Sequence, residues 1–347
     1  MTGAPHNWGI VGHTWAVDML QHALVNQRSA HAYLLSGPRH VGKALLALRL
    51  AQALNCETHA ADPCGTCRTC RRIAKGNYPD VRIASLQTQG ESLKSEEAAR
   101  QRDVRIDTVR AWLSDINLRP YEGRRRVFIL DDVERLSEGA ANAMLKALEE
   151  PPPYATFVLV AHTAGDIMPT IVSRCQRIKL RGVPRAQIVT WLVAQGVDAT
   201  HAQYCAAWSD GLPGMADFYA HNQDAVDQLN QRIDEFVELP RKSLNEGFKW
   251  AEEWAKTFRA GGQREVYDFL LLWQRWWRDL LLVATAANQH LTWVNRADDL
   301  ARVARGVSAD ECAGFLREIA KAVRQLRENT NPQLVFEHLF LVLPNRK

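Results

Sequence analysis

The sequence predicts an α/β domain built on a mostly parallel sheet, followed by helical domains. Three short apolar runs, at 32–37, 125–132 and 155–162, alternate with stretches of helical periodicity between Val11 and Leu180. Continuous apolar strands separated by helices indicate a parallel sheet that is covered on both faces. Strand patterns disappear after 179–187. We therefore expect an α/β nucleotide-binding core first and helical structure after it.

Length and composition favour several domains of an ordinary globular protein. The chain has 347 residues, more than one hydrophobic core usually serves, so two or three domains are expected. The formal net charge of +4 permits contact with nucleic acid but does not argue for it, because that inference needs clustered Lys and Arg. The N-terminus lacks a basic segment followed by an apolar run, so no signal peptide is predicted.

The most apolar stretch, residues 267–287, does not have the pattern of a membrane span. It carries four charged residues, Asp268, Arg275, Arg278 and Asp279. Such charges favour a buried or interfacial helix. The chain has seven cysteines and no secretory signal, which indicates a reducing compartment. We therefore expect a cytoplasmic protein without a membrane partner.

The first apolar run, "AYLLSG" (32–37), leads into a phosphate-binding pattern, Gly37-x4-Gly42-Lys43, and then into a helix predicted over 43–54. In such a loop, glycines let backbone N–H groups surround the phosphates and the lysine reaches the outer ones. The next residue is normally Ser or Thr, whose hydroxyl binds Mg²⁺, but here it is Ala44. The architecture of a phosphate loop is predicted, while binding of ATP and Mg²⁺ in it is left open.

A cysteine cluster follows that helix. Its members are spaced C-x7-C-x2-C-x2-C, at Cys56, Cys64, Cys67 and Cys70. Four thiolates in one short segment suit tetrahedral Zn²⁺ and leave no open position, so a structural zinc is predicted. Redox-active or incidental cysteines are the alternative. The isolated Cys175, Cys205 and Cys312 are expected in the core.

The second apolar run ends in Asp131-Asp132. Acids at the end of such a strand hold Mg²⁺ through water in nucleotide-driven motors, where the second acid is usually Glu. Asp132 is one methylene shorter, and a misplacement of about 1 Å can lower a rate by on the order of a hundredfold. The alternative is a pair of solvated acids. The basic segments 100–105 and 122–127, and the polar segment 90–103, are interpreted as solvated surface, with contact to DNA or a partner as the alternative for the basic segments.

A helix with clear ends is predicted before the third run. Ser137 is a plausible N-cap, an apolar face follows, and the prolines at 151–153 end the helix. The face is formed by Ala140, Met144, Leu145 and Leu148.

The C-terminal part divides into a small helical unit, 184–224, and a larger one, 225–347, rich in Trp, Leu and Ala. Aromatic residues at helical spacing are usually core, with a subunit interface as the alternative. The residues concerned are Trp250, Trp254, Trp273, Trp276 and Trp277.

Taken together, these segments resemble the clamp-loader subunits of bacterial DNA polymerase III, which belong to the AAA+ family. The resemblance rests on "VGHTWAVDMLQHAL", "HAYLLSGPRHVGK", the cysteine cluster, "GNYPDV", "RRVFILDDVERLSEGAANAMLKALEEPP" and "PTIVSRCQRIKL", and it is dense over about the first 180 residues. "SDGLPGMA" (209–216) and "NTNPQLVFEHLFLVL" (329–343) match more loosely.

The resemblance implies three domains. They are a RecA-like AAA+ domain at 1–183 with an inserted zinc module at about 56–70, a helical lid at 184–224, and an all-α collar at 225–347. It also implies partners: other clamp-loader subunits (tau/gamma, delta), and, through the assembly, a sliding clamp and primer–template DNA.

The resemblance further assigns site residues. Arg174, in the motif Ser173-Arg174-Cys175, is expected to be an arginine finger that reaches the γ-phosphate bound by a neighbouring subunit. An ordinary salt bridge is the alternative. At the chain's own nucleotide site, four residues differ from those of the family's motor subunits, which have a hydroxyl, a Glu, a sensor Thr or Asn, and a lid arginine at these positions. They are Ala44, Asp132, His162 and Gly214.

This imbalance predicts a ring subunit that hydrolyses ATP weakly or not at all and donates Arg174 in trans. Two other functions are the alternatives. An active ATPase of the tau/gamma type would need the missing hydroxyl and arginine. A stand-alone zinc-containing nucleic-acid binder would need a basic stripe near the cysteines, where Arg68, Arg71, Arg72 and Lys75 occur.

Overall fold

The computed structural model describes residues 8–58, 61–91, 103–162 and 164–344. They form two compact units. The first contains the chain up to Trp191 together with Gly211–Met215, and the second contains Leu192–Asp210 and the chain from Ala216 onward. The domain boundaries predicted near 183 and 224 remain predictions.

The first unit is built on a sheet of five parallel strands, which confirms the predicted fold class. The strands lie in the order β2-β3-β4-β1-β5. β4 lies between β1 and β3, with Leu35 opposite Val160 and Ile129 opposite Val158. The carboxyl ends of β1, β3 and β4 therefore meet at one edge. The bounds are β1 (Ala32–Ser36), β2 (Val81–Ala84), β3 (Arg126–Leu130), β4 (Ala155–Ala161) and β5 (Gln176–Lys179).

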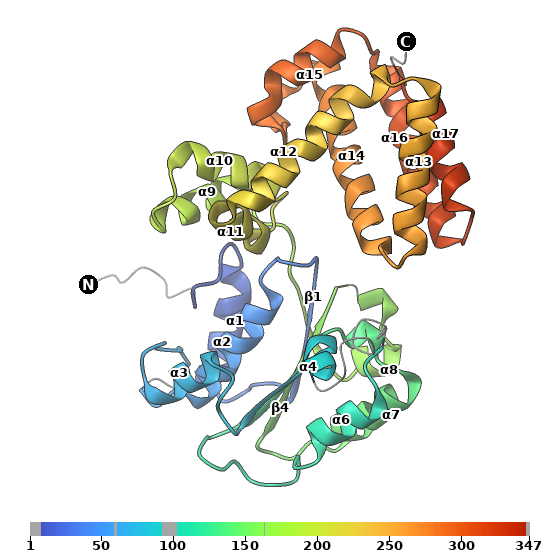
Figure 1. The fold of residues 1–347 in the computed structure, drawn as a ribbon. Helices are drawn as coiled ribbons and strands as arrows, with labels where there is room; N and C mark the ends of the chain where they lie inside the picture. The colour runs from blue at the N-terminus through green and yellow to red at the C-terminus, as the bar shows by residue number, and fades with distance from the viewer. Residues whose placement is uncertain (1–7, 59–60, 92–102, 163, 345–347) are drawn as a thin grey trace. The chain divides into compact units, whose positions relative to one another are not determined.

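Helices cover both faces of this sheet (Figure 1). α1 (Thr14–Val25) and α2 (Lys43–Asn55) lie on one side, with α3 (Arg68–Ala74) beside α2. On the other side are α6 (Ile106–Leu113), α7 (Glu138–Glu149) and α8 (Pro169–Val172). The remaining elements of this part are α4 (Leu86–Glu91) and two single turns, η1 (Val133–Arg135) and η2 (Ala164–Asp166).

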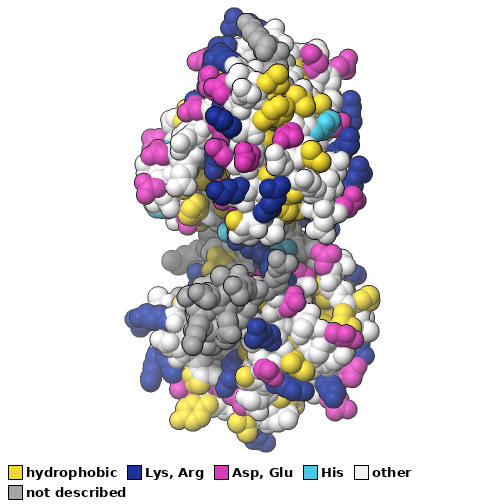
Figure 2. Space-filling view, turned by 45° about the vertical axis from the view of Figure 1, so that its right-hand side comes forward, with side chains coloured by type: hydrophobic (Ala, Val, Ile, Leu, Met, Phe, Trp, Pro, Cys, Tyr) yellow, Lys and Arg dark blue, Asp and Glu magenta, His cyan; other side chains and the backbone are white. Residues whose placement is uncertain are grey.

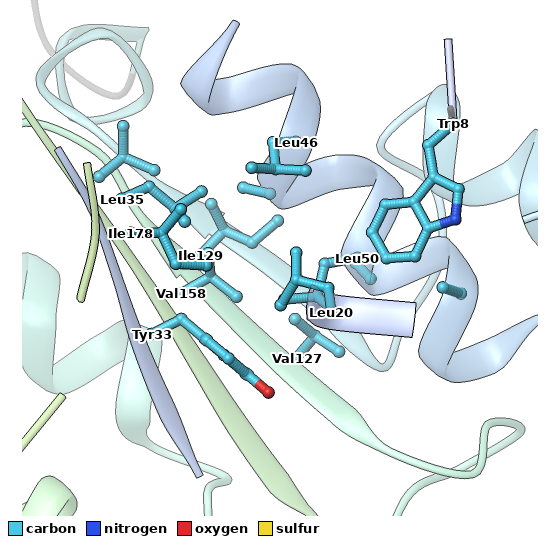
Figure 3. Packing of buried hydrophobic residues seen from close by; sticks show 14 of the residues in the cluster. Trp8, Leu20, Tyr33, Leu35, Leu46, Leu50, Val127, Ile129, Val158 and Ile178 are labelled. Atoms are coloured by element: carbon cyan, nitrogen blue, oxygen red, sulfur yellow. The ribbon is translucent and has the colours of Figure 1, made fainter. Parts of the chain in front are cut away.

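Two apolar cores follow from this layering, because alternate residues of each strand point to opposite faces. Figure 3 shows the core beneath α1 and α2, where Tyr33 and Leu35 of β1 meet Leu46 and Leu50 of α2. The opposite core takes Leu34 from the same strand. Since both faces of β1 are buried along its whole length, its sequence reads as a continuous apolar run.

The predicted helix before the third strand is confirmed as α7. The Ser137 hydroxyl accepts a hydrogen bond from the backbone N–H of Ala140, which satisfies one of the unpaired donors of the first turn. Met144 and Leu148 are buried on its inner face, while Leu145 is half-buried at the margin.

The second unit is helical throughout the part of it that the structure describes. Its elements are α10 (Ala199–Trp208), α12 (Gln223–Glu238), η3 (Leu239–Arg241), α13 (Leu244–Arg259), α14 (Gln263–Ala284), η4 (Asn288–His290), η5 (Val294–Arg296), α15 (Ala297–Ala304), α16 (Ala309–Arg327) and α17 (Pro332–Leu341). α9 (Arg185–Ala194) and α11 (Pro213–His221) each contribute residues to both units.

Aromatic side chains form the core of this second unit. All five tryptophans singled out from the sequence are buried within the chain itself. The rings of Trp250 and Trp273 meet edge to face at 5.7 Å, and Trp273 meets Phe315 in the same way at 5.0 Å. The core interpretation is therefore confirmed for these tryptophans. The apolar stretch 267–287 lies largely in α14, and no described helix is both long and apolar enough to cross a membrane.

Candidate functional site

The loop between β1 and α2 has the backbone of a phosphate loop. Gly37 (φ +148°) and Gly42 (φ +109°) have positive φ values that side chains rarely tolerate. A Cβ on Gly37 would lie 2.3 Å from the Leu180 carbonyl oxygen. The structure thus gives a physical reason for both glycines, and it places Lys43 directly after the second.

Lys43 is hydrogen-bonded within its own loop. Its buried ammonium donates to the carbonyl oxygens of Gly37 and Pro38, each at 2.7 Å, and lies 3.3 Å from Nδ1 of His162. Burial lowers the pKa of Lys43 to about 8. A phosphate oxygen that takes this lysine must exchange with those contacts. Ala44, exposed at the next position, offers no oxygen for a metal.

The two acids predicted for the site follow β3. The N–H of Asp132 donates to Oδ1 of Asp131 at 2.8 Å, and Asp132 has a left-handed backbone (φ +56°). Its Oδ1 lies 3.5 Å from an Arg39 guanidinium nitrogen and 3.6 Å from Nε2 of His162. Burial raises the pKa of the Asp131 carboxyl. Asp132 is therefore already engaged by side chains on neighbouring elements.

Glu134 is a member of this site that the sequence analysis missed. Its Oε1 accepts a hydrogen bond from the His162 backbone N–H at 3.2 Å and lies 3.7 Å from Nε2 of the same residue. Its side chain is only 10% exposed. Glu134 lies in the single turn η1, two residues after Asp132. The signal that would have found it is a further acid in the first turn after a strand that ends in acids.

Gly214 lies against the phosphate loop. Its N–H donates to the carbonyl oxygen of His40 at 2.9 Å, and a Cβ there would meet the same oxygen at 3.1 Å. The position that the resemblance assigns to a lid arginine therefore contacts the loop through a glycine backbone.

The four predicted cysteines come together. One sulfur from each of Cys56, Cys64, Cys67 and Cys70 lies within 4.8 Å of the others. The Sγ atoms of Cys64 and Cys70 are 4.0 Å apart, close to the ~3.8 Å edge of a tetrahedron with bonds of ~2.3 Å. The four sulfurs are thus spaced to hold one metal ion.

Backbone donors support thiolates in this cluster. The N–H of Cys67 donates to Sγ of Cys64 at 3.2 Å, and that of Cys70 to Sγ of Cys67 at 3.3 Å. Hydrogen bonds from the Thr58 hydroxyl and then from Cys67 lower the pKa of Cys64 to about 5. The cluster is tied to α2 by Gln52, whose amide donates to the Cys70 carbonyl oxygen at 2.7 Å.

The other cysteines largely follow the sequence prediction. Cys205 and Cys312 are buried, and burial raises the pKa of each thiol to about 11. Cys175 is half-buried and packs against the core on the α7 side.

Arg174 lies at the surface, just after α8. A guanidinium nitrogen contacts Oε1 of Glu149 at 2.7 Å, and another donates to the Thr170 carbonyl oxygen at 2.9 Å. The side chain is 35% exposed. It contacts α7 and α8, and none of these contacts joins it to the phosphate loop within the described residues.

The arginines of the basic segment 122–127 differ in burial: Arg124 is exposed, Arg125 is half-buried and Arg126 is buried. Arg126 is 7% exposed and contacts Asp115 at 2.7 Å and Asp80 at 3.6 Å. Arg124 and Arg125 donate to backbone carbonyl oxygens. On the face shown in Figure 2, coloured Lys and Arg side chains are interspersed with Asp and Glu. Most of 90–103, and half of the other basic segment, lies outside the described residues.

Comparison with known proteins shows which family this chain resembles in sequence. Residues 12–184 match the sequence model of a family described as DNA polymerase III, delta subunit. The chain is 25% identical over 328 residues to the DNA polymerase III subunit delta' of Bacillus subtilis (strain 168), and the match covers 94% of each protein. It is 33% identical over 226 residues to the DNA polymerase III subunit tau of the same organism, covering 65% of this chain and 37% of that protein.

A solved structure is also similar. It is that of a DNA polymerase III gamma subunit-related protein from Thermotoga maritima, with a TM-score of 0.43 and 20% identity, over 95% of this chain and 99% of that one.

Proposed function

The chain belongs to the family of DNA polymerase III delta subunits, and from this membership we propose that it acts as a delta-prime-like subunit of the clamp loader. In this proposal it hydrolyses ATP weakly or not at all, supports the ring of loader subunits, and lends Arg174 to the ATP site of a neighbour while a sliding clamp is placed on primed DNA.

The observation that carries the proposal is the difference between the chain's own phosphate loop, which lacks groups that ATP hydrolysis needs, and its surface at Arg174. At its own phosphate loop, the Lys43 ammonium is bonded to loop carbonyls, and Ala44 supplies no hydroxyl for Mg²⁺. Gly214 supplies no cation to the loop. These features fit poorly with a magnesium–ATP complex that is held for cleavage. Arg174, by contrast, is a surface cation just after the short helix α8.

Arg174 suits the role of a donor in trans. A guanidinium offers two parallel N–H donors and a fixed positive charge, which match the oxygens of a γ-phosphate as negative charge spreads over them. Glu149 holds the side chain at the surface through an exposed ion pair, and such pairs are weak enough to exchange for a phosphate.

We also propose that residues 184–224 form a lid and 225–347 a collar, and that the cysteine cluster binds a structural zinc. Four thiolates would complete the coordination of the ion, so it would stabilise the segment around α3 rather than activate water. The helical second unit, with its own aromatic core, is consistent with a collar.

The test is reconstitution with the other loader subunits. Arg174→Ala should lower ATP hydrolysis at the neighbouring site by about 10³-fold or more, so the assembly should lose that site's share of the steady-state rate. Arg177→Ala, an exposed arginine on adjacent β5, is the matched control and should leave the rate unchanged. An unaltered rate in Arg174→Ala would remove the finger assignment.

A second function, an active ATPase of the tau/gamma type, is favoured by the similarity to tau and by the retained Gly37, Gly42 and Lys43. Nucleotide binding by the purified chain separates the two. An active ATPase requires strong Mg²⁺ dependence and turnover of about 1 s⁻¹ or more. The delta-prime-like role predicts binding that is weak or insensitive to Mg²⁺, and no such turnover.

A further inference from the structure

The carboxyl ends of β3 and β4 bring three metal-ligating side chains together beside the phosphate loop. Asp132, Glu134 and His162 each present one ligand atom, and the three atoms lie within 4.8 Å of one another. Nε2 of His162 is 3.6 Å from Oδ1 of Asp132 and 3.7 Å from Oε1 of Glu134. Around a metal with bonds of ~2.1 Å, neighbouring ligand atoms are ~3.0–3.4 Å apart. The distances measured here are a few tenths of an ångström longer, so small side-chain shifts would bring the three atoms to coordination spacing.

Glu134 provides a second, independent observation. Its side chain is nine-tenths buried, and its carboxylate is directed at His162 through Oε1. The other carboxylate oxygen, Oε2, is buried and has no hydrogen-bond partner among the described residues. Buried carboxylates are ordinarily satisfied by donors or by cations. An unsatisfied oxygen in a cluster of metal-ligating groups points to a cation.

We propose that Asp132, Glu134 and His162 form a binding site for a divalent transition-metal ion, separate from the cysteine cluster. An imidazole nitrogen with two carboxylates suits Zn²⁺ or Mn²⁺, whereas Mg²⁺ prefers an all-oxygen, octahedral shell. Three protein ligands leave at least one coordination position for water or another oxygen. The inference concerns the chain alone and does not depend on the clamp-loader role.

The Lys43 and Arg39 side chains compete with a metal for the ligands of this site. Lys43 lies 3.3 Å from Nδ1 of His162, and because an ammonium can only donate, Nδ1 accepts and the neutral ring carries its proton on Nε2. A metal on Nε2 needs that proton on Nδ1 instead. Arg39 lies 3.5 Å from the Asp132 oxygen that the metal would take. Metal binding and these cation contacts therefore exclude each other, while Lys43 retains the Gly37 and Pro38 carbonyls.

The experiment is a titration of the full chain with Mn²⁺, in which free Mn²⁺ is followed by electron paramagnetic resonance. Mn²⁺ favours oxygen and nitrogen ligands over thiolates, so the cysteine cluster should not contribute. Wild type should bind one Mn²⁺ per chain. His162→Ala and Glu134→Gln should each weaken binding by at least about tenfold, since loss even of groups behind a ligand costs ~10–100-fold. His22→Ala and Glu150→Gln, both exposed, are matched controls and should bind as wild type does.

Lys43→Met is a sharper test, because competition between the Lys43 ammonium and the metal predicts the direction in which Mn²⁺ affinity changes. Removing the ammonium should tighten Mn²⁺ binding, whereas a phosphate-binding lysine would only weaken its ligand when removed. The proposal is overturned if wild type binds no Mn²⁺, if His162→Ala and Glu134→Gln bind as tightly as wild type, or if Lys43→Met binds less tightly. Circular dichroism melts should show that each variant is folded.

Discussion

Lys43 is a buried cation whose environment alters its titration. Burial lowers its pKa to about 8 from an ordinary value of 10.5, although Asp131 and Glu134 act in the opposite direction. A lysine with a lower pKa in the folded state binds fewer protons there, so its contribution to stability rises as pH increases from about 8 to 10.5. Relative to Lys43→Met, the free energy of unfolding of wild type should rise by at most about 1.4 kcal/mol per pH unit across this interval.

Urea denaturation of wild type and Lys43→Met, at several pH values between about 7 and 10, measures this difference. A difference that stays constant would show that Lys43 keeps its ordinary pKa in the folded protein, and a difference that falls with rising pH would show that its pKa is raised there.

Residues of the candidate site were predictable where spacing along the chain determines them. Gly37, Gly42 and Lys43 belong to one loop, and the four cysteines to one short segment, so local sequence carries the signal. The contact of Lys43 with His162 and the burial of Glu134 depend on how β4 aligns beside β1 and β3. That alignment is tertiary, and a single sequence does not specify it.

At the scale of elements, α13 and α17 approach closely at Gly247. A Cβ at this position would lie 1.9 Å from ring atoms of Phe340. Gly247→Ala should therefore overpack this helix contact and lower the free energy of unfolding by about 1–3 kcal/mol.

Gly314 is the matched control for that substitution, because it also lies inside a helix, α16. A Cβ there meets only the end of the Arg317 side chain, at 3.9 Å. Gly314→Ala should raise stability by about 0.5–1 kcal/mol, since Ala has the higher helix propensity. Thermal melts of both variants check the opposite signs, and a neutral or stabilising Gly247→Ala would contradict the predicted close contact.

The cysteine cluster and α3 form one element whose fold should depend on metal. If zinc joins the four sulfurs, Co²⁺-substituted protein should show thiolate-to-metal charge-transfer absorption, and chelation should lower the melting temperature. Cys67→Ser should reduce that absorption, whereas the isolated Cys175→Ser should not. Equal spectra from the two variants would mean that Cys67 is not a ligand.

Strands were predictable to the extent that they are buried. β1, β3 and β4 are buried at every position, so each appears in the sequence as an apolar run. β2 and β5 form the sheet edges, and no continuous apolar run marks them in the sequence. Only Ile178 of the four residues of β5 is buried, and β2 also has four residues, with a polar Arg82 among them. Short edge strands with exposed side chains lack a periodic signal.

At the scale of the whole molecule, the proposed role is asymmetric. The phosphate loop keeps the backbone of a nucleotide site. Its Lys43 contacts a loop carbonyl and His162, and His162 in turn contacts Asp132. The surface at Arg174 keeps a cation free to exchange its partner. The domain boundaries predicted near 183 and 224 stay predictions, and α9 and α11 each contribute residues to both compact units.

The contrast between the phosphate loop and Arg174 predicts that substitutions at these two places have different effects on the assembled loader. Lys43→Met removes the lysine on the receiving side, and if this chain does not cleave ATP, the rate of the assembly should stay within about twofold of wild type, or ~0.4 kcal/mol of barrier. Arg174→Ala should lower the same rate, because the neighbour loses charge that stabilises its transition state. Both variants should assemble equally, which size-exclusion chromatography would establish. If Lys43→Met lowered the rate as much as Arg174→Ala, the chain would be cleaving ATP itself, and the tau/gamma type of function would replace the one proposed.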